Sequence, residues 1–371
     1  MPAIRPLRAP AAAFSTPIAH LGAGRPDDRA GCCFEGAQKA MQARQCGPPG
    51  RPRGRRPRAR AGAGAEGVDA GTVGLAHRLA DAAGAVCREY WRAGVAVEAK
   101  GDESPVTVAD RKAEAAMRAL LAAEVPGHGV VGEEQGLEGG DREFVWVLDP
   151  IDGTKSFITG KPVFGTLIAL CRRGTPVLGV LDQPITGERW VGRAGEPSTL
   201  NGAPIATRPC PALSDAYLYT TSPHLFSPAT GPAFAALRDR IKTPLYGADC
   251  YAYGELNPRG GGGWAMPAPE RPADTLVPPH QIPFLLLGFW EAGLLAAGCC
   301  DLVCESGLKP YDYMALIPII EGAGGSVTDW EGRPLGWDPA RGMAPGEVLA
   351  SGDPGLHRQA LATLAQAGGA G

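Results

Sequence analysis

The sequence predicts an α/β domain in which helices are layered against a β-sheet, and three observations point to this fold class. Apolar residues recur at helical spacing from about residue 71 onwards. Runs of consecutive apolar residues after residue 143 are typical of buried strands. The first of these runs leads directly into a pair of aspartates. Helices followed by buried strands that end in acidic residues favour a layered domain over a helical bundle.

The first two predicted elements are helices. A helix is predicted over 71–90, because five apolar or small positions fall three or four residues apart and so share one face. These positions are Leu75, Leu79, Ala82, Val86 and Tyr90. A second helix is predicted from about Ala109, and it ends before Pro126-Gly127, where proline disfavours its continuation.

Strands are predicted next, over 144–148, 163–171 and 177–181, where apolar residues dominate. Towards the C-terminal part, 313–323 is predicted as a helix and 326–330 as a strand. The patterns at 248–254 and 294–298 are also helical. Together these elements supply both layers of an α/β domain.

The composition limits the class of protein. The chain has 371 residues, of which 44% are apolar and 20% charged, enough to build one large domain or two modest ones. A wholly disordered or fibrous protein is therefore excluded. The longest apolar run, 282–290, ends at Glu291, far short of the roughly 20 residues that span a bilayer. We expect no membrane partner.

The net charge of −3 is unevenly distributed. Residues 1–60 contain 12 Lys or Arg and 3 Asp or Glu, so the remainder of the chain is strongly acidic. An acidic body argues against a nucleic-acid partner and suits a protein that holds cations.

Residues 1–67 do not resemble a folded domain, because Pro, Gly, Ala and Arg dominate them. One interpretation is a disordered tail, or translation upstream of a true start near Met41 or later, which leaves the protein in the cytoplasm. Another is a transit peptide, since the segment is Arg-rich and has no acidic residue before Asp27; the protein would then enter a plastid in a photosynthetic organism. A nucleic-acid-binding tail is a weaker third option. The folded domain is expected over 68–371.

A second unusual segment, 255–293, interrupts the helical pattern that precedes and follows it. It contains four consecutive glycines and many prolines, and a segment of that composition cannot continue a helix. We interpret it as an insertion, either a long surface loop or a translated intron.

The ten cysteines form no Cys-x-x-Cys pair and are too dilute for a disulfide scaffold. We expect reduced thiols, with Cys300 and Cys304 as a buried pair. His77, His128, His224 and His280 show no metal-binding spacing and are assigned structural or surface roles.

The strongest chemical motif is Asp149-Pro-Ile-Asp152-Gly-Thr154. A strand ends in one aspartate and presents a second three residues later, so both carboxylates can project from one sheet edge, where hard divalent cations take oxygen ligands. Gly153 and Thr154 stand at a predicted helix start, where free N–H groups bind anions. Such a pairing suits a metal-assisted phosphoryl site, although an aspartate-rich turn alone has the same pattern.

Further acids strengthen this hypothesis. Glu133 and Glu134 lie in the Gly-flanked segment GEEQG, Asp110 lies where a short strand meets a helix, and Asp312 precedes the late helix. Taken singly, each is more typical of a helix cap or a solvated charge.

Together these motifs resemble the inositol monophosphatase-like, magnesium-dependent phosphatases. The resemblance covers about 72–254 and 294–350 and includes WVLDPIDGT at 146–154, Tyr311-Asp312 and the following GAGG at 322–325. It implies the layered αβαβα sandwich of the inositol monophosphatase/fructose bisphosphatase type.

The resemblance also implies roles for individual residues. The metal ligands would be the side chains of Glu133, Asp149, Asp152 and Asp312, with the carbonyl of Ile151. Gly153 and Thr154 would contact the phosphate. Asp110 would pair with the Thr154 hydroxyl and, with Glu133, orient and deprotonate the attacking water. Lys100 matches a basic residue near the entrance of the site.

The implied mechanism is in-line attack of a metal-activated water on a small-molecule phosphate ester. The oxygen ligands suit Mg²⁺, with Mn²⁺ possible, rather than zinc. The resemblance adds that two or three ions act together and that members commonly form homodimers.

Within the family, the sequence is most similar to the histidinol-phosphatase branch of histidine biosynthesis, through KSFITG at 155–160, DCYAY at 249–253 and ESGLKPYD at 305–312. Histidinol phosphate carries an ammonium and an imidazole, so its pocket needs acids beyond those that hold metal. Asp249 and Glu305 are the candidates, although a helix cap or surface charge is the simpler interpretation of Asp249 alone. The alternatives are an inositol-1-phosphate or sugar-phosphate phosphatase, and a chain impaired by the 255–293 insertion.

Overall fold

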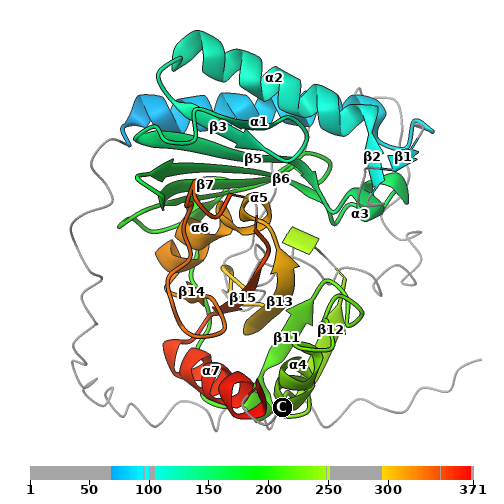
Figure 1. Cartoon of the computed structure of the whole chain (residues 1–371), viewed down its shortest axis with the longest axis vertical. Coiled ribbons are helices and arrows are strands. Elements are labelled where there is room, and N and C mark those ends of the chain that lie inside the picture. The colour runs from blue at the N-terminus through cyan, green and yellow to red at the C-terminus, as the bar shows by residue number, and fades with distance from the viewer. Residues whose placement is uncertain are drawn as a thin grey trace, which may run out of the picture. The chain divides into compact units, whose positions relative to one another are not determined.

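The computed structural model describes residues 68–94, 97–99, 105–247, 249–250, 295–342 and 344–368. These residues form two large β-sheets, with helices between and outside them, and a small two-stranded sheet (Figure 1). The predicted tail at 1–67, the predicted insertion at 255–293 and Lys100 lie outside the described residues. Among the helices that are described, none combines the length and the apolar character needed to cross a bilayer.

Two long helices cover one face of the larger sheet. α1 spans Ala70–Tyr90 and α2 spans Val108–Glu124, which confirms both predicted helices. Side chains cap the first turn of each, because Asp69 accepts a hydrogen bond from the Thr72 N–H and Thr107 accepts one from Ala109. α1 packs on β6 and β7 and α2 on β5 (Figure 1).

The larger sheet has eight strands in the order β10-β9-β8-β7-β6-β5-β3-β4, and β3 and β5 are its one parallel pair. Its strands are β3 Gly129–Gly132, β4 Gly136–Glu138, β5 Phe144–Asp152, β6 Gly165–Arg172, β7 Thr175–Gln183, β8 Glu188–Arg193, β9 Thr199–Leu200 and β10 Ala203–Pro204. β5, β6 and β7 confirm the predicted strands. β5 is four residues longer than predicted, because the backbone stays extended through Pro150 up to Asp152. A separate two-stranded sheet pairs β1 Val97–Ala99 with β2 Pro105–Thr107.

The smaller sheet has five strands in the order β12-β11-β13-β15-β14. Its strands are β11 Tyr217–Thr220, β12 Thr243–Tyr246, β13 Leu302–Leu308, β14 Ser326–Thr328 and β15 Gly346–Ser351. Helices α4 Gly231–Arg238 and α7 Pro354–Gly368 cover its outer face, preceded by the short 3-10 turn η1 Leu213–Asp215. β14 lies within the predicted strand at 326–330 and is shorter than predicted.

Between the sheets lie α5 Pro310–Tyr313 and α6 Leu316–Gly322 (Figure 1). The prediction of one helix over 313–323 was wrong: the helical segment begins at Pro310 and breaks before Leu316. Pro318 explains the break, since it has no N–H to bond the carbonyl of Met314. α6 approaches the larger sheet so closely that a Cβ at Gly179 would lie 1.9 Å from the Ala315 carbonyl oxygen.

The order of layers is therefore helices, sheet, helices, sheet, helices, and the predicted αβαβα sandwich is confirmed. Apolar side chains fill the spaces between these layers. The central core joins the inner faces of both sheets to α5 and α6 and includes the buried side chains of Leu167, Trp190, Met314 and Ile319. This core fixes the end of β5 relative to the start of α5, which is where the acidic motifs lie.

Candidate active site

Three of the predicted acids meet where β5 ends and α5 begins. One carboxylate oxygen each of Asp149, Asp152 and Asp312 lies within 4.8 Å of those of the other two. Two thus come from the larger sheet and one from a helix about 160 positions later in the chain. The sandwich brings together residues that the sequence keeps far apart.

Local backbone contacts hold each of these carboxylates. The register between β5 and β6 shifts between Asp149 and Asp152, so that the strand does not continue with regular pairing. Asp149 accepts a hydrogen bond from the Ile151 N–H at 3.1 Å, Asp152 from the Cys250 N–H at 2.7 Å, and Asp312 from the Lys309 N–H at 2.7 Å. Each acid keeps oxygen lone pairs free of these bonds for another ligand.

Glu133 reaches the same cluster from the turn that joins β3 to β4. Its backbone N–H donates to the carbonyl of Leu148 on β5 at 3.2 Å. Its negative charge and its hydrogen bond with the Asp149 carboxyl both raise the pKa of Asp149. Glu133 is therefore the fourth carboxylate of the cluster.

Mutual repulsion and burial shape the electrostatics of the cluster. Burial raises the pKa of Asp149 well above its usual value, and Glu133, Asp152 and Asp312 raise it further. Burial and the charge of Asp249 raise the pKa of Asp152 to about 7. Burial and the charge of Asp152 likewise raise the pKa of Asp312. Holding several carboxylates this close in their ionised form requires a positive charge between them.

Asp110 lies at the start of α2 and is 1% exposed. Its Oδ2 accepts from the Thr107 N–H at 2.8 Å and from the Thr107 hydroxyl at 2.6 Å. Its buried Oδ1 has no hydrogen-bond partner among the described residues. A buried acceptor without a partner is costly, and so points to a further ligand at this position.

The structure does not join Asp110 to Thr154 by a hydrogen bond. The Thr154 hydroxyl instead donates to the Ile151 carbonyl at 3.2 Å, while Thr107 engages Asp110 as the cap of α2. The pairing predicted from the sequence is therefore not formed in this structure, because the Thr154 hydroxyl bonds the Ile151 carbonyl and leaves Oδ1 of Asp110 without a partner among the described residues.

Gly153 and Thr154 stand at the start of α3, which spans Thr154–Ile158. Gly153 has φ +84, a left-handed conformation that favours glycine. A Cβ at this position would also lie 2.8 Å from Oδ2 of Asp249. Glycine is required here both for the turn and for the approach of Asp249.

Asp249 and Glu305, the two acids predicted to bind substrate, lie beside the acids predicted to bind metal. A small cavity, named here the acidic cavity, is lined by Asp152, Thr221, Asp249, Cys250, Glu305, Leu308 and Asp312. Asp249 Oδ2 accepts from the Ser156 hydroxyl at 2.9 Å, and burial raises the pKa of its carboxyl. Both oxygens of Glu305 are engaged, by the Thr220 hydroxyl at 3.1 Å and the Thr221 N–H at 2.6 Å.

The donor set of this region fits hard divalent cations. It consists of clustered carboxylate oxygens and the orphaned Oδ1 of Asp110. The neighbouring Cys250 thiol does not add a soft ligand, because burial and the charge of Asp152 raise its pKa well above the ordinary value. Oxygen-only donors favour magnesium or manganese over zinc.

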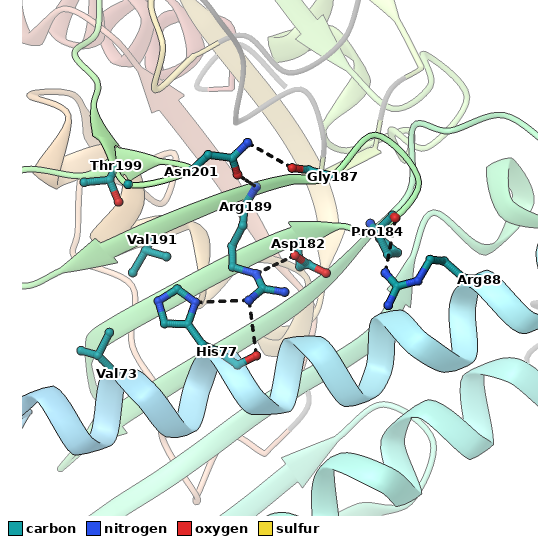
Figure 2. Close-up of a pocket in the computed structure, with 11 residues that line it drawn as sticks. Val73, His77, Arg88, Asp182, Pro184, Gly187, Arg189, Val191, Thr199 and Asn201 are labelled. Carbon is teal, nitrogen blue, oxygen red and sulfur yellow. Dashed lines mark hydrogen bonds and ion pairs between the residues drawn. The ribbon is translucent and has the colours of Figure 1, made fainter. Parts of the chain in front are cut away.

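A larger cavity of about 420 Å³ lies elsewhere, between α1 and the β7–β8 part of the sheet (Figure 2). This helix-side cavity is lined by Val73, His77, Arg88, Asp182, Pro184, Gly187, Arg189, Val191, Thr199, Asn201 and Gly202. Arg189 crosses it and donates to Asp182 at 2.7 Å and to Asp81 at 2.8 Å. Its guanidinium also lies 3.2 Å from Nδ1 of His77. Positive and negative charges are matched here, so His77 has the structural role that the sequence predicts.

Comparison with known proteins identifies the family. The sequence model of the inositol monophosphatase family matches residues 72–254 and 281–368. The chain belongs to the inositol monophosphatase family. Members act as phosphatases on small-molecule phosphate esters and are generally Mg²⁺-dependent. The match leaves out 255–280, which lie within the segment predicted to be an insertion.

Individual relatives agree with this assignment. The chain is 47% identical over 294 residues to a bifunctional phosphatase, IMPL2, described as chloroplastic, from Arabidopsis thaliana, with 78% of this chain and 74% of that protein covered. It is 29% identical to a histidinol-phosphatase of Chlorobaculum parvum, with 78% and 95% covered. A solved inositol monophosphatase of Zymomonas mobilis is 43% identical, with a TM-score of 0.63 and 80% and 100% of the two chains covered.

Sequence reasoning missed several residues of this inositol monophosphatase family site. Ser156 bonds Asp249, and Thr220 and Thr221 bond Glu305. The signal for Ser156 was its place in the first turn of the helix after Thr154. No strand was predicted before Thr220 and Thr221, so nothing in the sequence analysis pointed to these threonines. The contribution of Cys250, through its backbone N–H, has no signal in the residue type.

Proposed function

We propose that this phosphatase hydrolyses L-histidinol phosphate to L-histidinol and phosphate, in histidine biosynthesis. The observation that carries the proposal is the position of Asp249, which lines the acidic cavity next to Asp152 without being part of the Asp149–Asp152–Asp312 cluster. A carboxylate beyond the metal ligands suits a substrate that carries an ammonium and an imidazole. An inositol ring would need only neutral hydroxyl partners.

The names of the relatives support the same substrate. The bifunctional phosphatase of Arabidopsis is 47% identical, and histidinol-phosphatases of Chlorobaculum parvum, Streptomyces coelicolor and Mycobacterium tuberculosis are 29%, 32% and 31% identical.

The proposal assigns two or three magnesium ions to the carboxylates of Glu133, Asp149, Asp152 and Asp312 and to the carbonyl of Ile151. When bound, magnesium neutralises phosphoryl oxygens and lowers the pKa of water. The acids orient the ions by their fixed places on β5, α5 and the β3–β4 turn.

The remaining residues bind the ester and move a proton. Gly153 and Thr154 contact the phosphate at the start of α3. Asp110, through its Oδ1, accepts the proton of the attacking water, and Glu133 helps to orient that water towards phosphorus. Thr154 takes part by turning its hydroxyl away from the Ile151 carbonyl, which a single side-chain rotation achieves.

Asp249 is the better candidate of the two substrate acids. Glu305 is 3% exposed and its two oxygens already accept hydrogen bonds from Thr220 and Thr221. Asp249 is partly exposed, and among the described residues only its Oδ2 accepts a hydrogen bond, from the Ser156 hydroxyl. We assign Asp249 to the ammonium or imidazole of the substrate and Glu305 to holding the cavity wall.

The test is phosphate release by the full chain with Mg²⁺ from histidinol phosphate, inositol 1-phosphate, fructose 1,6-bisphosphate and adenosine 3′,5′-bisphosphate. We expect the highest kcat/KM on histidinol phosphate. Asp249→Asn should raise KM for histidinol phosphate about tenfold or more, equivalent to about 1.4 kcal/mol, and leave KM for inositol 1-phosphate nearly unchanged. The exposed Asp239→Asn is the matched control. Preference of the wild-type protein for another ester would overturn the substrate assignment.

An inositol phosphate is the second candidate substrate. The 43% identity to a solved inositol monophosphatase over the whole of that chain favours it, and the Arabidopsis relative is named bifunctional. The same panel separates the two, since turnover of inositol 1-phosphate at a comparable kcat/KM would show a dual activity.

The predicted insertion and tail are tested separately. Comparing the full chain with a form lacking 255–293 shows whether the segment is a tolerated loop; activity only in the shortened form would identify an impaired translation product.

We propose a plastid location, in line with the chloroplastic relative, and expect residues 1–67 to carry a fluorescent protein into plastids. Cytoplasmic fluorescence would favour the alternative. Light scattering of the purified protein tests the proposed homodimer.

A further inference from the structure

Glu114 lies one turn of α2 beyond Asp110 and has no role in the site described above. Its side chain is fully buried, at 0% exposed. Oε2 accepts from the backbone N–H of Glu134 at 2.7 Å, and Oε1 from that of Gln135 at 3.1 Å. Both donors belong to the turn that carries Glu133. A buried carboxylate is thus placed under the backbone of a predicted metal-binding loop.

Arg118 completes the contact one helical turn further on. Its Nε donates to Oε1 of Glu114 at 2.8 Å, and its Nη2 donates to the carbonyl of Gly136 at 2.5 Å. The arginine is 14% exposed at its side chain, so it compensates the buried charge of Glu114 and also fixes the far end of the turn. Charge-assisted bonds of this kind are stronger than neutral ones.

The turn itself is adapted to this contact. A Cβ at Gly132 would lie 2.0 Å from Oε1 of Glu114, so only glycine allows the loop to close over the carboxylate. Three successive backbone N–H groups are then held: that of Glu133 by Leu148 on β5, and those of Glu134 and Gln135 by Glu114. With both its flanks fixed, the Glu133 carboxylate stays beside Asp149.

We infer that Glu114 and Arg118 are positioning residues, which set the metal affinity of the site by holding the Glu133 loop, and do not touch substrate. The inference rests on the proposed role of Glu133 as a metal ligand. It does not depend on which phosphate ester is hydrolysed. Such a role predicts a loss in metal binding that excess metal restores, since the four carboxylates themselves remain.

The test is Glu114→Gln in the full chain, with Mn²⁺ binding followed by electron paramagnetic resonance and Mg²⁺ activation followed by phosphate release. Glutamine keeps the size but provides one acceptor oxygen in place of two. We expect the dissociation constant for Mn²⁺ and the Mg²⁺ concentration for half-activation to rise about tenfold, within the range of such supporting residues. At saturating Mg²⁺, kcat and the KM for the ester should stay within twofold of wild type.

Arg118→Met is the second variant and should cause a smaller loss of metal affinity of the same kind. Glu124→Gln is the matched control, because it lies at the other end of α2 and pairs with Arg78 on the surface. Unchanged Mn²⁺ binding in both Glu114→Gln and Arg118→Met would overturn the inference. An equal loss of kcat at every Mg²⁺ concentration would also overturn it. If the wild-type protein binds Mn²⁺ but does not hydrolyse histidinol phosphate, the substrate proposal fails. The Mn²⁺-binding measurements still decide the role of Glu114.

Discussion

The two cavities of this protein differ in how their charges are matched. In the helix-side cavity, the guanidinium of Arg189 lies between Asp81 and Asp182 and beside His77, whose pKa is lowered by burial and by the charge of Arg189. In the acidic cavity, Asp152, Asp249, Glu305 and Asp312 share one wall. Burial raises the pKa of each of these four acids.

The difference shows which cavity is built for a ligand. Matched charges offset the cost of each other's burial without a ligand. Clustered like charges repel one another, and a bound cation relieves that repulsion. The larger cavity therefore needs no ligand, and the smaller one is our candidate for the site.

The largest effect is expected at Asp152. Asp152→Asn keeps an acceptor for the Cys250 N–H but removes a charge from the cluster. We expect kcat/KM to fall at least 10³-fold, about 4 kcal/mol. In EDTA, urea unfolding should show the variant to be more stable than wild type, because repulsion is relieved. A metal-free variant less stable than wild type would contradict the repulsion argument.

The opposite outcome is expected in the helix-side cavity. Arg189→Leu leaves Asp182, whose side chain is 7% exposed, without its partner. We expect the free energy of unfolding to fall by about 3 kcal/mol, with kcat and KM unchanged. Adding Asp182→Asn to the variant should recover part of the stability. A change in KM with full stability would give this cavity a role in the reaction.

The next effect is the pH dependence of stability that arises from the buried side chain of His357. Burial lowers the pKa of His357 to about 4, and its ring nitrogens lie 2.9 Å from the hydroxyls of Thr328 and Ser351. The unfolded chain binds a proton near pH 6.5, which the folded chain takes up only near pH 4. The contribution to stability is complete above pH 6.5 and is lost as the pH falls towards 4, by about 3 kcal/mol.

Urea unfolding of wild type and His357→Gln, both with Mg²⁺ present, checks this. The variant should lose less stability between pH 7.5 and pH 5 than the wild type does. Parallel pH profiles would show that another group titrates.

The smallest effect is expected for the surface pair Arg78–Glu124, with side chains 50% and 38% exposed. Solvent screens such pairs, so Arg78→Gln should change the free energy of unfolding by no more than about 0.5 kcal/mol. Thermal unfolding at low and high salt measures it. A larger loss would mean that matched charge stabilises this chain even without burial.

Local patterns in the sequence predicted some elements and residues and not others. α1, α2 and β5–β7 were predictable because each has its own periodic or continuous pattern of apolar residues. The candidate metal-binding acids were predictable because they lie in one local motif or beside a helix start. The break between α5 and α6 was not predicted, since the pattern of apolar residues continues through Pro318. The order of the strands in the two sheets also has no local signal.

Contacts between distant segments were the hardest to predict. Asp110 was correctly placed at a helix start, but the sequence does not show whether the hydroxyl of Thr107 or that of Thr154 bonds its carboxylate. Glu114 gives only a weak signal, an Arg four residues later that is typical of any exposed helix face. Its burial under the Glu133 loop arises from the close approach at Gly132, which only the folded structure shows.

The position of α5 and α6 between the sheets has a consequence for synthesis of the chain. All eight strands of the larger sheet lie within residues 129–204, whereas the helices that cover its inner face lie at 310–322. While the ribosome makes the hundred residues between them, the sheet has no cover for the apolar side chains that later form the central core. The nascent protein therefore passes through a stage at which it must avoid aggregation, with help from chaperones or by delaying closure of the sheet. The Asp149–Asp152–Asp312 cluster is likewise complete only after that stage, once Asp312 has emerged.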